Sequence, residues 1–139
     1  MIQKIIDGVS TAIRTGYDKN YKIYTETVAQ GLKTPSFSVL CLNGTDEQQV
    51  GSRHDRSYLL NISYFPFTSE AITECLDVME NLYILLGIIS VGNSFLCGKN
   101  MSGTVVDGVL QFQVTYAPTI LMIADETSME EVKVKTNGN

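Results

Sequence analysis

The dipeptide Asp107-Gly108 stands between two strand-like stretches, Thr104–Val106 and Val109–Tyr116. A type I′ turn needs positive φ at both central positions, and Asp-Gly is among the pairs that best meet this need. Four apolar residues of the second stretch recur at the period of a half-buried strand: Leu110, Phe112, Val114 and Tyr116. The sequence therefore predicts a β-hairpin here, with these four side chains facing inward and Pro118 ending the strand.

Three further stretches have the composition of strands. Ser57–Phe65 alternates, and Pro66 ends it because proline lacks the N–H that a β-ladder needs. Ser36–Leu42 is apolar on both faces, which predicts a central strand. Tyr21–Val28 is rich in aromatic and β-branched residues, which favours a strand. Two shorter β-prone pieces and a turn are expected later in the chain: Ile88–Val91, Ser94–Cys97 and Gly98–Asn100.

Two segments carry the period of a helix. In Met1–Gly16 the apolar residues step by three and four along one face, which predicts an amphipathic helix. Gly8 costs this helix about 1 kcal/mol relative to alanine, so we expect it to need a packing partner. Ser69–Leu86 contains no glycine or proline and is the predicted core helix, with Ser69 as N-cap and Gly87 as C-terminal stop. Its predicted core stripe is Ile72, Cys75, Leu76, Met79, Leu82, Tyr83 and Leu86.

These elements predict an α+β fold, in which a mixed, mainly antiparallel sheet packs against the N-terminal amphipathic helix and one long core helix. A chain of 139 residues is near the usual domain size, so residues 1–139 are expected to form one domain, with residues 119–139 as a candidate C-terminal arm. The longest apolar run, Leu82–Val91, is far shorter than the roughly 20 residues of a membrane span, so no membrane contact is expected. The start of the chain lacks a secretory signal pattern, which predicts synthesis in a cytoplasm.

The segment Gly44–Arg56 is almost wholly polar and contains glycine, whereas both flanking segments are strand-like. It is expected to be a long exposed hairpin loop. Loops of this kind are frequent contact sites. The candidate contact residues are Asp46, Glu47, Gln48, Gln49, Arg53, His54, Asp55 and Arg56.

The C-terminal segment changes character. After an apolar patch at Ile120–Ile123 and a polar stretch, charged residues alternate with valine. Such a charged strand is either a guard against aggregation at a sheet edge or an arm that pairs with a neighbouring subunit, and the sequence leaves both readings open. The candidate arm residues are Glu130, Glu131, Val132, Lys133, Val134 and Lys135.

No catalytic or metal-binding motif is present. His54 is the only histidine, and neither CxxC, HExxH nor GxSxG occurs, so we expect no metal, no cofactor and no catalytic residue. The glycines of the chain match neither of the two phosphate-binding patterns GxxxxGK[ST] and GxGxxG. Cys41, Cys75 and Cys97 are widely spaced in apolar contexts, which predicts reduced, buried thiols.

The charge balance disfavours a general nucleic-acid binder, because the formal net charge is −5. Lys33, Arg53 and Arg56 could touch phosphate, and Tyr58 and Tyr64 could stack on bases. Core packing explains the two tyrosines better, since they alternate with core-facing positions.

The segment Arg56–Pro66, with the order of elements described above, resembles the tail terminator proteins of tailed phages. The likeness is greatest to the short forms in prophages and contractile-tail particles of Gram-positive bacteria. Met1–Gly16 is similar to the short helix that opens such proteins, and the resemblance spans most of residues 1 to 118. It implies a structural protein at the head-proximal end of a virion tail, assembled in the host cytoplasm.

The resemblance also implies partners. A tail terminator forms a homo-oligomeric ring, usually a hexamer, that caps the tail tube protein, stops tube polymerisation and offers a docking surface to the head-tail connector or sheath protein. DNA passes without specific binding, and no reaction is catalysed. Under this resemblance the polar segment Gly44–Arg56 is a candidate contact to the tube or to the lumen of the ring. The alternatives are a head-tail connector, another minor tail component or a small enzyme without a known motif.

Overall fold

A seven-stranded, mostly antiparallel sheet forms the main layer of the computed structural model, which describes residues 1–26, 32–122 and 132–135. Its strands are β1 (Lys22–Tyr24), β2 (Ser36–Gln48), β3 (Arg53–Phe65), β6 (Lys99–Val106), β7 (Val109–Tyr116), β8 (Thr119–Met122) and β9 (Val132–Lys135). The strand order is β1-β2-β3-β7-β6, and β8 pairs with both β3 and β9. Only the β1–β2 pair is parallel, so the sheet is mixed and mainly antiparallel as predicted.

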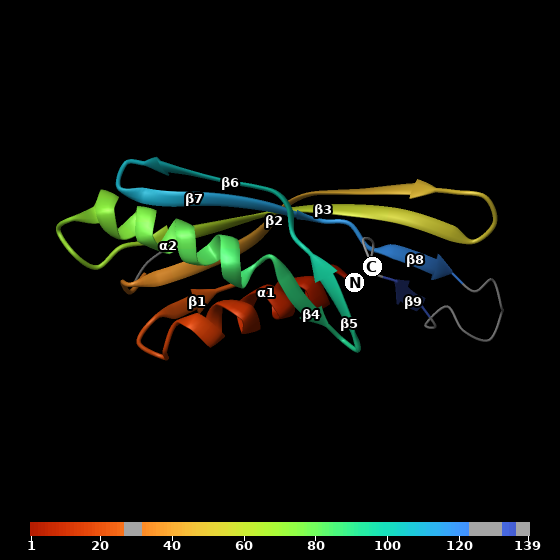
Figure 1. Ribbon diagram of the computed structural model, residues 1–139, viewed down its shortest axis with the longest axis horizontal. Coiled ribbons are helices and arrows are strands. Elements are labelled where there is room, and N and C mark those ends of the chain that lie inside the picture. Colours follow the sequence, from red (N-terminus) through yellow and green to blue (C-terminus); the bar gives the residue numbers. More distant parts are fainter. Residues whose placement is uncertain (27–31, 123–131, 136–139) are drawn as a thin grey trace.

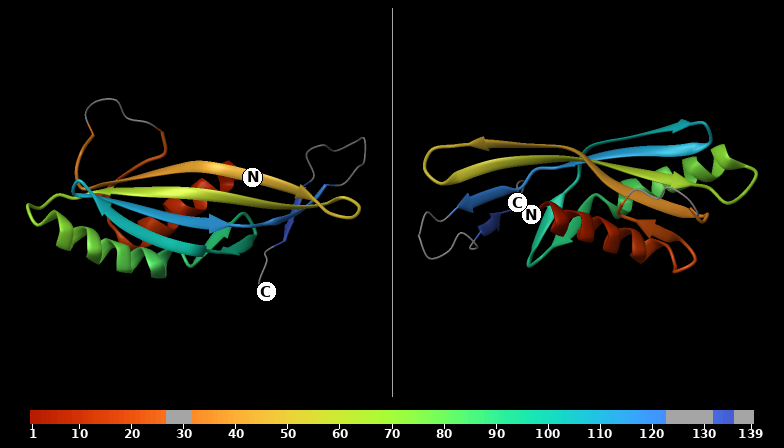
Figure 2. Two further views of the ribbon diagram at one scale, coloured as in Figure 1. Left: turned by 90° about the horizontal axis from the view of Figure 1, so that it is seen from above. Right: turned by 180° about the vertical axis from the view of Figure 1, so that it is seen from behind.

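Two helices lie side by side on one face of this sheet (Figure 1). They are α1 (Ile2–Gly16) and α2 (Ala71–Leu85), and a separate hairpin of β4 (Ile88–Val91) and β5 (Ser94–Cys97) lies beside α1. The predicted α+β class is confirmed. The core lies between the helices and the sheet, and both described helices lie on that one face (Figure 2).

The predicted hairpin at Asp107-Gly108 is confirmed. Asp107 has φ 52° and Gly108 has φ 75°, so both central residues have the positive φ of a type I′ turn. All four predicted core side chains of β7 are fully buried. At the far end of the strand, the Tyr116 hydroxyl donates a 2.7 Å hydrogen bond to the carbonyl of Leu86, which ties β7 to the C-terminal end of α2.

The dependence of α1 on a packing partner is visible at Gly8. A Cβ on Gly8 would lie 2.5 Å from the carbonyl oxygen of Ser90, so the absence of a side chain lets β4 approach the helix closely. Ile5, Val9 and Ile13 are buried on the same face, as the helical pattern predicts. The polar residues Lys4, Asp7, Thr11 and Arg14 are exposed.

Two expectations for α2 are wrong. The helix begins after Glu70, which is its N-cap, and Ser69 does not cap it. Ile72 and Leu76 are 63% and 44% exposed, whereas Val78, outside the predicted stripe, is buried. The reason is the position of α2 over β7 and the edge strand β6: one apolar side of the helix extends past the edge of the sheet.

Three smaller expectations also fail. The first strand is only three residues long among the described residues, and 27–31 lie outside them. Lys99 and Asn100 belong to β6 rather than to a turn. The cysteines are free, but only Cys75 is buried: Cys97 is half-buried and Cys41 is exposed. Cys41 has the same strand parity as the buried Phe37 and Val39, but β2 is exposed from this residue onward.

Candidate functional site

Residues Gly44–Arg56 form a β-hairpin rather than the long loop that their polarity suggested. Asp46, Glu47 and Gln48 lie in β2, Arg53–Arg56 lie in β3, and only residues 49–52 form the turn. The pairs Asp46↔Arg56, Glu47↔Asp55 and Gln48↔His54 stand opposite one another. Because both faces meet solvent, the hydrophobic alternation that signals a strand is missing here. The one available signal was the oppositely charged pair Asp46 and Arg56, placed symmetrically about the turn, and the like-charged pair Glu47 and Asp55 obscured it.

This hairpin extends beyond the helix layer, and we call residues 44–56 the overhanging hairpin (Figures 1 and 2). The burial pattern marks the boundary. Leu60, Ile62 and Tyr64 of β3 are buried under the helices, whereas β2 is exposed from Cys41 onward. Val50, in the turn, is 98% exposed. The overhanging hairpin therefore presents both faces and an apolar tip to its surroundings.

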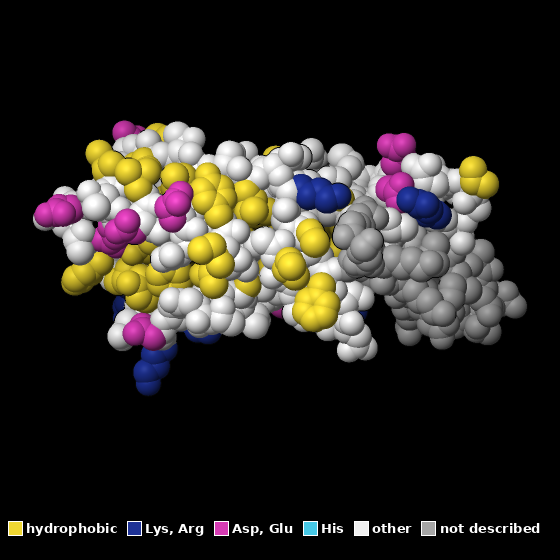
Figure 3. Space-filling view, viewed as in Figure 1, with side chains coloured by type: hydrophobic (Ala, Val, Ile, Leu, Met, Phe, Trp, Pro, Cys, Tyr) yellow, Lys and Arg dark blue, Asp and Glu magenta, His cyan; other side chains and the backbone are white. Residues whose placement is uncertain are grey.

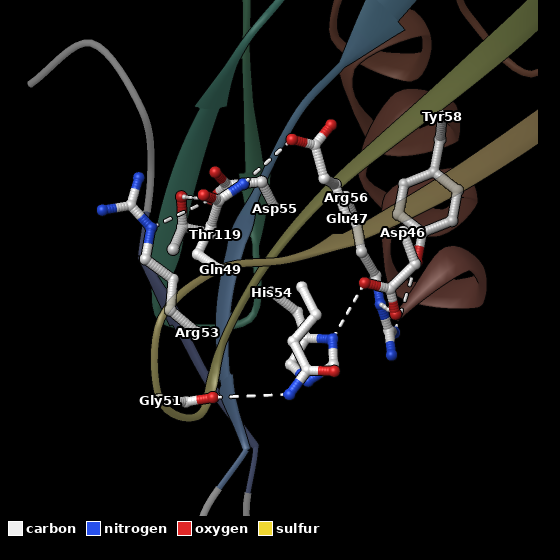
Figure 4. Close-up of polar contacts among 11 residues, drawn as sticks. Asp46, Glu47, Gln49, Gly51, Arg53, His54, Asp55, Arg56, Tyr58 and Thr119 are labelled. Atoms are coloured by element: carbon white, nitrogen blue, oxygen red, sulfur yellow. Dashed lines mark hydrogen bonds and ion pairs between the residues drawn. The ribbon is translucent and has the colours of Figure 1, made fainter.

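One face of the overhanging hairpin carries an ion-paired cluster centred on Asp46 (Figure 4). The Nδ1 atom of His54 lies 2.9 Å from Oδ1 of Asp46, and Nε of Arg56 donates a 3.1 Å hydrogen bond to Oδ2. The hydrogen bond with His54, followed by that with Arg56, holds the pKa of the Asp46 carboxyl below its usual value. One carboxylate thus links a direct and a diagonal cross-strand neighbour, which stabilises the strand register.

The other face carries a second set of polar contacts (Figure 4). Glu47 and Asp55 stand directly opposite one another, and like charges in this position destabilise a β-ladder. Each carboxylate has its own donor: Gln49 Nε2 lies 3.2 Å from Oε1 of Glu47, and Arg53 Nε lies 3.1 Å from Oδ1 of Asp55. Thr119 Oγ1 donates a further 3.1 Å bond to Asp55, so β8 also anchors this face.

The candidate C-terminal arm is only partly described. Glu130 and Glu131 lie outside the described residues, while the other four candidates form β9 and pair with β8: Val132, Lys133, Val134 and Lys135. β8 in turn pairs with Arg53–Asp55 at the base of the turn in the overhanging hairpin. The arm and the overhanging hairpin, distant in the sequence, are therefore adjacent (Figure 1).

The arrangement does not favour phosphate binding or metal binding. Arg53 and Arg56 are engaged by carboxylates, and Lys33 precedes the opposite end of β2, about 30 Å away at 3.3 Å per residue. Tyr64 is buried in the core, and Tyr58 is half-buried and packs against the core. Within residues 1–26, 32–122 and 132–135, no three His, Cys, Asp or Glu side chains group closely enough to hold a metal ion.

A third polar site lies away from the overhanging hairpin, at the N-terminal end of α2. The carboxylate of Glu74 accepts hydrogen bonds from the hydroxyl of Tyr64, from both the amide and the hydroxyl of Thr68, and from the amide of Phe67. Partial burial acts to raise the pKa of Glu74, but these hydrogen bonds outweigh it and lower the pKa to about 2. This carboxylate holds the β3–α2 connection to the core, and a role in fold stability accounts for all its contacts.

The family model described as phage tail terminator protein matches residues 4–129 of the chain. The chain belongs to the phage tail terminator family. A search of curated proteins found no match. The family match includes most of α1, all of α2 and the overhanging hairpin, and it confirms the resemblance seen in Arg56–Pro66.

Membership of the tail terminator family makes this protein a structural component of a phage tail. It associates there with other tail components. No helix in the described part of the chain is long and apolar enough to cross a membrane.

Proposed function

We propose that this protein forms a homo-oligomeric ring, a hexamer in the usual form of the family, at the head-proximal end of the tail. The ring caps the tail tube, stops polymerisation of the tube protein, provides the docking surface for the head-tail connector or sheath protein, and catalyses no reaction. The observation that carries the proposal is the family match over residues 4–129. The formal net charge of the chain is −5, which fits a ring that lets DNA pass without specific binding, because an acidic protein repels phosphate.

We assign the contact with the tube to the overhanging hairpin. Its two ion-paired faces support a fixed shape for the ribbon, while Val50 projects an apolar side chain from its tip. Binding residues are often found on loops that a rigid scaffold positions, and Val50 lies in the turn of such a ribbon. The candidate inter-subunit arm, β9, pairs with β8, which in turn pairs with Arg53–Asp55 of the overhanging hairpin. From this position β9 can pair with a neighbouring subunit in the ring.

The test must keep the ribbon intact. Replacing residues 45–55 by a Gly-Ser linker would also remove Arg53–Asp55, the strand segment with which β8 pairs. Val50→Asp changes only the tip. We expect a folded protein that no longer caps tubes, measured as tails of uncontrolled length by electron microscopy in cells whose own copy of the gene is deleted.

Ile88→Asp is the matched control, because Ile88 is an exposed apolar residue on the separate β4–β5 hairpin. This control should give tails of normal length. Normal, length-controlled tails from Val50→Asp would contradict the assignment of the tip to the tube contact. Normal tails from cells that lack the protein altogether would contradict the terminator function itself.

A further inference from the structure

A strip of apolar side chains runs along the outer side of α2 and the inner face of β6. Ile72 and Leu76 are 63% and 44% exposed, and the remaining members are partly buried and packed against the core. The strip consists of Ile72, Leu76, Met79, Tyr83, Met101 and Val105. Figure 3 shows hydrophobic side chains gathered over α2 and beside it, with acidic side chains among them. The hydrophobic core thus continues to the surface at this edge of the fold.

The strip follows from where α2 lies. Met79 reaches the backbone of the edge strand, since a Cβ on Gly103 would be 2.6 Å from its Sδ atom. β6 ends the strand order, and its outer edge pairs with no strand among the described residues. From Ser102 to Val106 this edge carries no charge and no proline, the two common devices that prevent strand association. The edge therefore has the properties of an association surface.

Acidic and basic residues are distributed unevenly along the chain. Residues 57–98 contain four acidic residues, all on or next to α2, and no basic residue: Glu70, Glu74, Asp77 and Glu80. The first three line a hollow on the side of α2 toward α1, whereas Glu80 is exposed and follows Leu76 of the strip by one helical turn. Residues 1–33, which include α1 and β1 at the opposite edge, contain five basic and three acidic residues. The five basic residues are Lys4, Arg14, Lys19, Lys22 and Lys33.

We propose that the α2–β6 edge of one subunit docks against the α1–β1 edge of a second copy of this chain. The inference rests on the ring proposed above, because a closed ring needs a heterologous contact between two different surfaces of each subunit. The apolar strip supplies the buried centre of the contact. β6 and β1 are the two ends of the strand order, so the contact joins opposite edges of two subunits. Glu80, beside the strip, pairs with a basic side chain of the neighbour's α1–β1 edge, which helps to set the orientation of the subunits.

The first test uses the two exposed members of the strip. In Ile72→Asp/Leu76→Asp, charge replaces apolar surface at positions that already meet solvent, so the fold should remain intact by circular dichroism. Ile84→Asp is the matched control: Ile84 is 79% exposed on the same helix and lies by Gly16 and Tyr17, on the side toward α1. We expect the double variant to be monomeric by native mass spectrometry and the control to assemble as the wild type does.

The second test asks whether the contact is head-to-tail. Lys19→Glu/Lys22→Glu alters the basic edge and should also block assembly. Mixed with Ile72→Asp/Leu76→Asp, it should give a discrete heterodimer, because one intact α2–β6 edge then meets one intact α1–β1 edge. Absence of that heterodimer, with each variant folded, overturns the pairing of these two edges.

The outcomes separate the two proposals. Should the wild type assemble only on tube ends, the same variants are compared by chemical crosslinking on purified tails. Rings formed by Ile72→Asp/Leu76→Asp as readily as by the wild type overturn the interface and leave the terminator function standing. A wild-type protein that is monomeric both in solution and on tails overturns both the proposed ring and the proposed interface.

Discussion

The hydroxyl of Tyr64 donates a hydrogen bond to Oε2 of Glu74, which joins the central strand β3 to the first turn of α2. Tyr64 is 1% exposed, and its ring packs against Phe37 with centroids 4.8 Å apart. Burial, reinforced by the neighbouring carboxylate, raises the pKa of the Tyr64 hydroxyl, so it stays protonated and remains a donor. The contact connects the layer of the helices to the sheet at the end opposite to the overhanging hairpin.

Removing the charge of Glu74 should therefore destabilise the fold. Glu74→Gln cannot accept all four hydrogen bonds, and we expect a loss of about 1–3 kcal/mol in the free energy of unfolding at pH 7. The pKa of Glu74 is lowered in the folded state to about 2, so its contribution is complete above the unfolded value of about 4.3 and is lost as the pH falls toward 2. Urea unfolding of both proteins at several pH values checks this.

The control for that measurement is Glu80→Gln, which alters an exposed carboxylate on the same helix. It should leave the free energy of unfolding almost unchanged at every pH. A Glu74→Gln protein as stable as the wild type at pH 7, or a difference that persists undiminished at pH 2, would contradict the role given to the carboxylate.

Asp46→Asn should loosen the overhanging hairpin without unfolding the core. The substitution weakens the contacts with His54 and Arg56, but Asp46 is exposed, so global stability should change little. We expect the amides of residues 44–56 to exchange with solvent several-fold faster, while those of β7 are unaffected. Because the pKa of Asp46 is lowered in the folded state, the wild-type protection is present above the unfolded value of about 3.9 and is lost as the pH falls through the folded one.

Hydrogen exchange followed by mass spectrometry measures the effect of Asp46→Asn on the hairpin amides. Glu47→Gln, on the opposite face, is the control: it relieves the like-charge pair with Asp55 and should not accelerate exchange. Equal protection of residues 44–56 in Asp46→Asn and the wild type would show that the ion pairs do not hold the ribbon.

Gly8→Ala should destabilise the protein, although alanine is the better helix former. The new methyl group would lie 2.5 Å from the carbonyl oxygen of Ser90, so α1 and β4 must move apart. We expect a loss of about 1–3 kcal/mol, typical of overpacking, against a gain of about 1 kcal/mol from helix propensity alone. Thr11→Ala, at an exposed position of α1, is the control and should be neutral or slightly stabilising; thermal unfolding separates the two results.

Local patterns in the sequence are enough to predict most elements of this fold. The turn at Asp107-Gly108, the inward face of β7 and the buried face of α1 were all correctly predicted, because each depends on residues near one another in the chain. The membership of the tail terminator family was also visible in Arg56–Pro66 and the order of elements.

Tertiary structure decided the features on which the proposed contacts depend. Residues 44–56 form paired strands, and the contacts that support the pairing, such as Asp46 with Arg56, join residues of two different strands. The pattern of one polar strand does not reveal such a pairing. Ile72 and Leu76 have the helical spacing of core residues, yet they are exposed because α2 lies over the edge of the sheet. Periodicity shows which side chains share a face; only the packing of distant elements determines whether another layer covers that face.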